Sequence, residues 1–126
     1  MIKIVYCITR KEGLSREQFQ EYWRNYHGES VVERAKTIGM VKYAQSHTVT
    51  SRLGDGSAES RGVAEPYDGV MEGWWESDDA AVAALGSDGG RAAAEFLLAD
   101  ESTFIDFSKS RIFTTREFVW EFAAAR

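Results

Sequence analysis

The chain has 126 residues, a length typical of one domain with its own hydrophobic core. Hydrophobic residues make up 44% and aromatic residues 13% of it, which predicts a folded globular protein rather than a disordered chain. The net charge of -5 and the absence of a cluster of Lys and Arg exclude a surface built to bind nucleic acid, because phosphate binding needs such clusters.

Cysteine content and hydropathy indicate the compartment. Cys7 is the single cysteine, so no internal disulfide and no thiolate-bound structural metal are expected. No apolar run is long enough for a membrane span, and the N-terminus is too short for a signal peptide. We therefore expect residues 1–126 to form a single soluble, cytoplasmic domain with no membrane partner.

The first two predicted elements are a strand and a helix. Residues 2–9 are rich in β-branched and aromatic types and apolar on both alternating faces, which indicates a strand covered on both sides. Ser15 and Gln18 have the spacing of a capping box, and Leu14 and Phe19 that of a hydrophobic staple. A helix therefore begins at Ser15.

This helix carries a stripe of bulky side chains. Gly39 is a candidate left-handed residue that ends the helix. His27 lies on the stripe one turn after Trp23. The stripe runs through positions 19, 22, 23 and 26 and then 30 or 31.

Residues 40–50 alternate in the manner of a second strand, with an aromatic and polar face that is unusual for a plain core. That face consists of Val41, Tyr43, Gln45, His47 and Val49.

Residues 51–66 are small, polar and glycine-containing, and end with the single proline, Pro66. We expect a flexible loop. Because long loops in compact domains usually have a function or are disordered, we expect this one to be mobile without ligand and to cover the mouth of a pocket.

The second half of the chain repeats the alternation of strand and helix. Residues 67–77 predict a third strand, followed by an acidic helix start at Asp78 and an Ala-rich helix that breaks into two pieces around Gly86 to Gly90. Residues 110–120 predict a fourth strand. The element order is βαββαβ.

This order predicts an α+β fold of the split βαβ, or ferredoxin-like, type: a four-stranded antiparallel sheet with two helices on one face. No further element remains to cover the other face of the sheet. A second copy of the chain, packed sheet against sheet, would cover it, so we expect a homodimer.

The residues resemble the EthD-domain family, a branch of the dimeric α+β barrel superfamily. The resemblance spans almost the whole chain and rests on "GLSREQFQEYWRNYHGE" in the first helix, "YAQSH" in the second strand, "YDGVMEGWWES" in the third strand, and "ESTFID" with "SRIFTTRE" near the end. The helix motif ending in His-Gly is the most specific of these.

The resemblance implies a small-molecule function. Founding members are accessory proteins of an ether-degrading monooxygenase system. Others are similar to cofactor-free methylmuconolactone isomerases and to dehydratases or cyclases of aromatic polyketide intermediates, in which paired pocket histidines transfer protons. Those two positions correspond to His27 and His47.

A single histidine on an apolar helix face is more often a satisfied core residue than a catalyst. In a βαββαβ fold, however, the first helix packs over the sheet, so we expect His27 and His47 to line one cavity and act as catalytic acid and base, with no cofactor and no metal. The predicted substrate-binding residues are Tyr6, Tyr22, Trp23, Tyr26, Tyr43, Gln45 and Glu72. The aromatic ones suit a flat, hydrophobic or aromatic substrate.

The leading hypothesis is a cofactor-independent dehydratase, cyclase or isomerase acting on an aromatic or polyketide-like substrate. Two alternatives stay open: a non-catalytic accessory or binding protein of a monooxygenase system, and a cofactor-free monooxygenase, which would be an oxidoreductase. Glu72 is a further ionisable candidate, which can instead pair with Arg111 or Arg116 across the sheet.

Overall fold

The computed structural model describes residues 1–124. Helices and strands alternate along the chain, with one short π-helical and one 3-10 segment. The elements are β1 (Ile2–Ile8), α1 (Arg16–Tyr22), η1 (Trp23–His27), α2 (Gly28–Arg34), β2 (Lys42–His47), α3 (Arg52–Arg61), β3 (Gly69–Trp75), α4 (Asp78–Gly86), α5 (Asp88–Glu101), η2 (Phe107–Lys109) and β4 (Arg111–Thr115).

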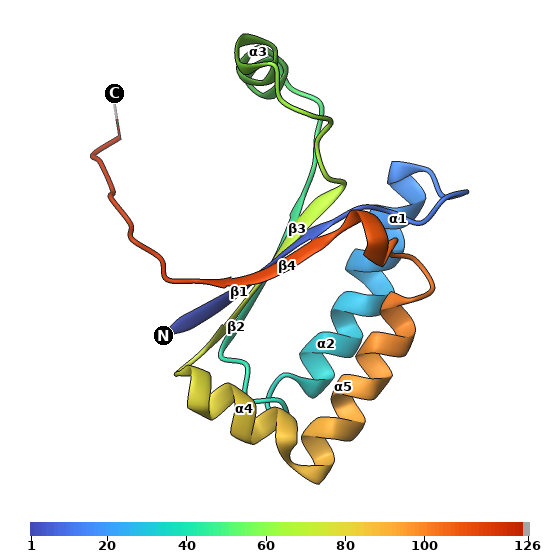
Figure 1. The fold of residues 1–126 in the computed structure, drawn as a ribbon, viewed down its shortest axis with the longest axis vertical. Helices are drawn as coiled ribbons and strands as arrows, with labels where there is room; N and C mark the ends of the chain where they lie inside the picture. Colours follow the sequence, from blue (N-terminus) through green and yellow to red (C-terminus); the bar gives the residue numbers. More distant parts are fainter. Residues whose placement is uncertain (125–126) are drawn as a thin grey trace.

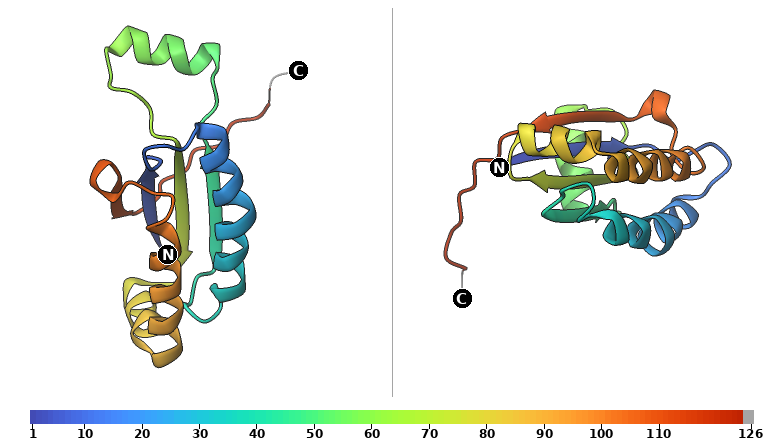
Figure 2. Two further views of the ribbon diagram at one scale, coloured as in Figure 1. Left: turned by 90° about the vertical axis from the view of Figure 1, so that its right-hand side faces the viewer. Right: turned by 90° about the horizontal axis from the view of Figure 1, so that it is seen from below.

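The four strands form one antiparallel sheet in the order β2-β3-β1-β4, which confirms the predicted α+β fold. The long helix made of α1, η1 and α2 lies beside α5 on one face of the sheet, and α4 covers the end of that face (Figures 1 and 2). The opposite face, here called the open face, has no helix over it in the described part of the chain. It includes Lys3, Val5, Glu72, Trp74 and Phe113, which share a face through the strand register.

The start of the first helix forms as the sequence predicts. The Ser15 side chain accepts a hydrogen bond from the Gln18 amide at 3.1 Å, and the Gln18 side chain accepts one from the Ser15 amide at 2.9 Å. Leu14 packs against the cluster that contains Phe19. Gly39 adopts a φ of +77°, so it has the left-handed conformation expected of it after this helix.

A π-helical segment, η1, interrupts the helix over Trp23–His27. Side chains four residues apart drift around an α-helix by about 40°, because one turn takes 3.6 residues. The wider turn of η1 offsets this drift. As a result Phe19, Trp23, His27 and Val31 are all buried on one face.

The second helical region consists of two helices, as predicted. The break falls at Ser87, whose backbone is extended and whose hydroxyl accepts a hydrogen bond from the Gly90 amide at 3.1 Å. The paired glycines, Gly89 and Gly90, belong to the first turn of α5 and are not themselves the interruption. A serine cap therefore sets the position of the break.

The structure differs from the prediction for residues 51–66 and for the length of the fourth strand. The segment 51–66 is not a loop throughout, because Ser51 caps the helix α3 at Arg52–Arg61. No residue of α3 is buried, and the helix projects from the end of the sheet, away from α2 and α5 (Figure 1). The fourth strand ends at Thr115, because pairing with β1 stops at Lys3.

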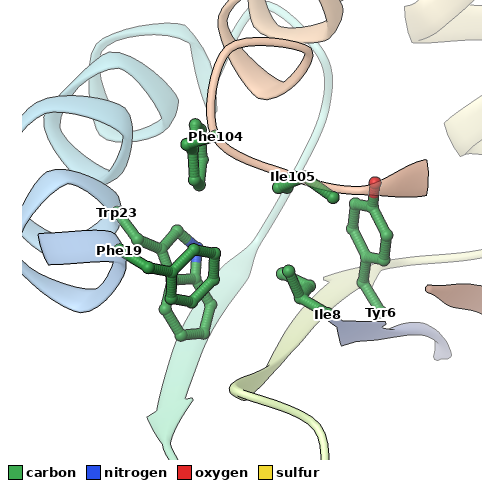
Figure 3. Packing of buried hydrophobic residues seen from close by; sticks show 6 residues of the cluster. All are labelled: Tyr6, Ile8, Phe19, Trp23, Phe104 and Ile105. Atoms are coloured by element: carbon green, nitrogen blue, oxygen red, sulfur yellow. The ribbon is translucent and has the colours of Figure 1, made fainter. Parts of the chain in front are cut away.

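The core between helices and sheet consists of two clusters. The first contains Tyr6, Ile8, Phe19, Trp23, Phe104 and Ile105 (Figure 3). The second contains Val31, Ile38, Trp75, Ala93 and Leu97. Trp23 packs against β3 at Gly69, where an added Cβ would lie 2.3 Å from the indole ring. A glycine at this position is therefore needed for the indole to reach the sheet.

Candidate functional site

A cavity of about 160 Å³ lies where the two core clusters meet, between the helices and the sheet. Its wall is mostly apolar. The lining residues are Ile4, Tyr6, Ile8, Trp23, His27, Val31, Ile38, Met40, Tyr43, Met71, Trp75, Leu85, Ala94, Leu97 and Glu101. A space of this kind, with few polar groups, is suited to a small and largely apolar molecule.

His27 contributes an imidazole to the cavity wall and is held in place by α5. Its Nδ1 lies 2.8 Å from Oδ2 of Asp100, and the Tyr22 hydroxyl donates to Oδ1 of the same carboxylate. His27 makes no other side-chain hydrogen bond within residues 1–124. Nε2 is therefore the ring nitrogen left to meet a bound molecule.

Burial lowers the pKa of His27 below its ordinary value of 6.5, while the Asp100 carboxylate acts in the opposite direction and raises it. The imidazole is consequently neutral at neutral pH. Nδ1 then carries the ring proton and donates a hydrogen bond to Asp100, and Nε2 has a free lone pair. A neutral imidazole oriented in this way is suited to removing a proton from a ligand.

His47 lies behind Trp23 instead of in the cavity. The two rings are 4.5 Å apart between centroids, and Nε2 of His47 lies 2.8 Å from Oε1 of Gln45. The Gln45 amide in turn donates to the Trp23 carbonyl at 3.0 Å and to the Tyr43 hydroxyl oxygen at 2.8 Å. The expectation was that both histidines line one cavity, but within residues 1–124 the cavity wall includes His27 and Trp23 and does not include His47.

Four of the seven predicted substrate-binding residues line the cavity or a groove beside it. Tyr6, Trp23 and Tyr43 line the cavity with His27. Gln45 contacts Tyr43 from outside, along a surface groove that both residues line. Tyr43 is therefore common to the groove and the cavity.

The remaining three lie elsewhere. Tyr22 binds Asp100, and Tyr26 is 65% exposed and stacks on Tyr22 at 5.3 Å between ring centroids. Glu72 lies on the open face and pairs with Lys3 at 2.6 Å, not with either of the arginines considered from the sequence. The stripe predicted from the sequence included Tyr26 because a regular α-helix was assumed. In the π-helical segment η1, the Tyr26 side chain lies on the exposed side instead.

Two acidic residues of the site, Asp100 and Glu101, were missed by sequence analysis. Both lie at the end of α5, where Asp100 binds His27 and Glu101 lines the cavity. A signal was present: Ala93, Leu97 and Glu101 are spaced by four residues, and the first two are buried. Extending that apolar stripe by one turn leads to a carboxylate directed toward the core.

Within residues 1–124, no three His, Cys, Asp or Glu side chains come together in a group that could hold a metal ion. In the same part of the chain, no helix combines the length and apolar character that crossing a membrane requires.

The sheet, the helices on one of its faces and the cavity between them define a ferredoxin-like α+β protein with space for a small molecule. The EthD domain model matches residues 11–108, and the chain belongs to the EthD domain family. None of the curated proteins matches the chain.

Solved structures share the fold. An EthD family protein from Bacillus halodurans is 16% identical, with a TM-score of 0.63 over 94% of this chain and 99% of its own. A dimeric ferredoxin-like protein of unknown function from Bacteroides fragilis is 8% identical, with a TM-score of 0.57 over 92% and 95%. SnoaB, a cofactor-independent oxygenase from Streptomyces nogalater whose structure is that of a point mutant, is 16% identical, with a TM-score of 0.50 over 92% and 91%.

Proposed function

We propose that this protein is a cofactor-independent enzyme in which His27 transfers a proton to or from a flat, mostly apolar substrate in the cavity. The observation that carries the proposal is the chain of hydrogen bonds from Tyr22 through Asp100 to His27. A carboxylate behind a histidine fixes its tautomer and orientation, which is how imidazole bases are commonly prepared for catalysis.

The other polar groups of the cavity suit the same chemistry. The Tyr43 oxygen accepts a hydrogen bond from Gln45, so its own O–H remains free to donate to a substrate oxygen. Burial raises the pKa of Tyr43 above its ordinary value of 10, and the hydroxyl therefore stays protonated. Proton removal beside a carbonyl, with Tyr43 binding the carbonyl oxygen, is a step that dehydration, cyclisation and isomerisation of polyketide-like aromatics can share.

A cofactor-independent oxygenase is the second candidate, favoured by the similarity to SnoaB. The two functions differ in the origin of any oxygen added to the product. Incubating the pure protein with aromatic polyketones, with and without O₂ and in ¹⁸O-labelled water, and measuring product mass separates them. Ligand binding without any product would instead favour the accessory role.

For His47 we propose a positioning role. His47→Ala is expected to lower kcat by about tenfold, because Gln45 and the Trp23 indole lose their support and Tyr43 shifts. The measurement is deuterium exchange at the acidic carbon of 2-tetralone, a cyclic ketone fused to a benzene ring, in D₂O by NMR.

His47→Gln is the matched variant, because its amide can still donate to Oε1 of Gln45. It should recover most of the lost rate. Equal losses in the two variants would instead indicate that His47 itself transfers a proton.

We further propose that the chain forms a homodimer through the open face, as the Bacteroides fragilis protein is described to be a dimer. Phe113→Asp is expected to weaken dimerisation at least tenfold, because Phe113 is 47% exposed on the open face and the new carboxylate would be buried by a second copy. The measurement is sedimentation equilibrium across protein concentrations.

Ile112→Asp is the matched control for this change. Ile112 is the neighbouring residue of β4, is 56% exposed, and has its side chain on the helix-covered face. The control should dimerise as the unchanged protein does. An unchanged dissociation constant for Phe113→Asp would exclude the open face as the interface.

A further inference from the structure

Glu101 is the carboxylic acid of the cavity wall. It is the last residue of α5, and its carbonyl oxygen accepts hydrogen bonds from the amides of Phe104 at 3.1 Å and Ile105 at 2.9 Å. This turn also carries Phe104 and Ile105 into the first core cluster. The backbone of Glu101 is thus fixed from both sides, and the side chain has a defined position facing the cavity.

The surroundings of Glu101 favour its uncharged form. Within the described residues, no Lys or Arg lines the cavity. The titratable groups that face Glu101 are Tyr6 from β1, Tyr43 from β2, His27 from η1 and Asp100 from its own helix.

Burial, the largest contribution, raises the pKa of Glu101 from 4.5 to about 7, and the Asp100 charge adds to this. The neighbouring Tyr6 hydroxyl acts in the opposite direction and lowers the pKa of Glu101.

We propose that Glu101 is the catalytic acid of this cavity: it protonates the oxygen of a substrate carbonyl while Nε2 of His27 removes a proton from the adjacent carbon. This inference rests on the proposed function of His27. In the step, the C–H bond breaks and its electron pair forms the carbon–carbon double bond of an enol. The carbonyl oxygen takes the proton of Glu101, and the products are an enol, an imidazolium and a carboxylate.

The cycle closes without any further reactant. The imidazolium returns its proton to carbon, at the original position or at a conjugated one, and the enol oxygen returns its proton to Glu101. When the imidazolium first exchanges its proton with solvent, return to the original carbon gives isotope exchange, and return to the conjugated carbon gives an isomer.

The same wall defines the substrate class. The cavity wall contains a carboxylic acid and, in the described part of the chain, no cation that could pair with an anionic group. The cavity therefore favours a neutral ketone over a carboxylate. The aromatic side chains of Tyr6, Trp23 and Tyr43 add a preference for flat rings. We therefore assign neutral, enolisable ketones that carry an aromatic ring as the ligands.

The pH dependence of exchange tests the role of Glu101. Activity requires neutral His27 and protonated Glu101 together, so the rate should fall below the lowered pKa of His27 and again above about pH 7. In 2-tetralone exchange, Glu101→Gln should reduce kcat by about tenfold to a hundredfold near pH 6.5 and remove the fall above pH 7, because an amide cannot transfer the proton.

Two further variants sharpen the test. Tyr6→Phe removes the hydroxyl that lowers the pKa of Glu101, so the alkaline fall should move to higher pH. Glu95→Gln changes the same charge on an exposed face of α5 and should leave the profile unchanged.

Folding of Glu101→Gln is checked by thermal unfolding as a function of pH. Because the pKa of Glu101 is higher in the folded protein than its ordinary value of 4.5, the folded state binds more protons between pH 4.5 and about 7, and its stability decreases as pH rises through that window. Glu101→Gln should lack this decrease and be no less stable than the unchanged protein at pH 8.

The outcomes separate the two proposals. If His27→Gln abolishes exchange while Glu101→Gln keeps both the rate and the alkaline fall, the function of His27 stands and the role of Glu101 is wrong. If His27→Gln exchanges the ketone as fast as the unchanged protein, or if the unchanged protein exchanges it no faster than buffer, both proposals are wrong.

Discussion

Replacing His27 by glutamine is expected to reduce kcat for exchange of 2-tetralone by about a hundredfold or more with little change in KM. Glutamine preserves much of the side-chain volume and can donate a hydrogen bond to Asp100, but it has no basic nitrogen at the position of Nε2. Loss of rate without loss of binding would therefore report the missing base and not a damaged cavity.

Asp100→Asn is the companion variant, because it keeps the shape of the side chain and removes the charge that fixes the Nδ1–H tautomer. Its rate should lie between those of the unchanged protein and of His27→Gln. Full activity in both variants would return His27 to the role of a packed core residue.

Replacing Trp23 by alanine is expected to lower the free energy of unfolding by about 3–5 kcal/mol, the largest stability effect of any change considered. Trp23 is 1% exposed, packs on Phe19 at 5.5 Å and on His47 at 4.5 Å between ring centroids, and meets Gly69 without a gap. Chemical denaturation followed by circular dichroism measures the change.

Tyr26→Ala is the matched control for Trp23→Ala, since Tyr26 is an aromatic residue of the same η1 segment and is 65% exposed. Its effect should stay below about 1 kcal/mol. Similar losses in both variants would mean that the indole is not the centre of the core, and that the cavity wall beside His27 depends on other contacts.

The order of strands and helices could be predicted from the sequence because each element has a local sequence signal. The Ser15 capping box, the alternation of β2 and the left-handed Gly39 each depend on a few neighbouring residues. The structure confirms the four strands and the two helical regions in the predicted order and adds α3 between β2 and β3. The family match over residues 11–108 agrees with the resemblance seen in the motifs.

The site was only half predictable, for two physical reasons. A π-helical turn has no simple sequence signature, so Tyr26 was placed on the inner face although it is exposed. The carboxylates of Asp100 and Glu101 resemble ordinary helix-end charges until the packing of α5 against η1 brings them to His27 and the cavity. Tertiary contacts, not local pattern, select which acids are buried.

The helix α3 shows a related limit. Glycine and serine are weak helix formers, and the segment has no apolar stripe, so composition favoured a loop. The Ser51 cap and the left-handed Gly62 mark the two ends of a helix nevertheless. No residue of α3 is buried, and within the described residues none of them lines the cavity. The expectation that this segment covers the pocket therefore stays a prediction.

The carbonyl oxygen of Trp23 accepts two hydrogen bonds, one from the turn that carries His27 and one from the side chain that binds His47. It accepts the Gly28 amide, which closes the π-helical turn carrying His27, and also the Gln45 amide, whose other end holds His47. The backbone turn that carries His27 and the side chain that holds His47 therefore meet at one carbonyl oxygen, although the two imidazoles bind different acceptors.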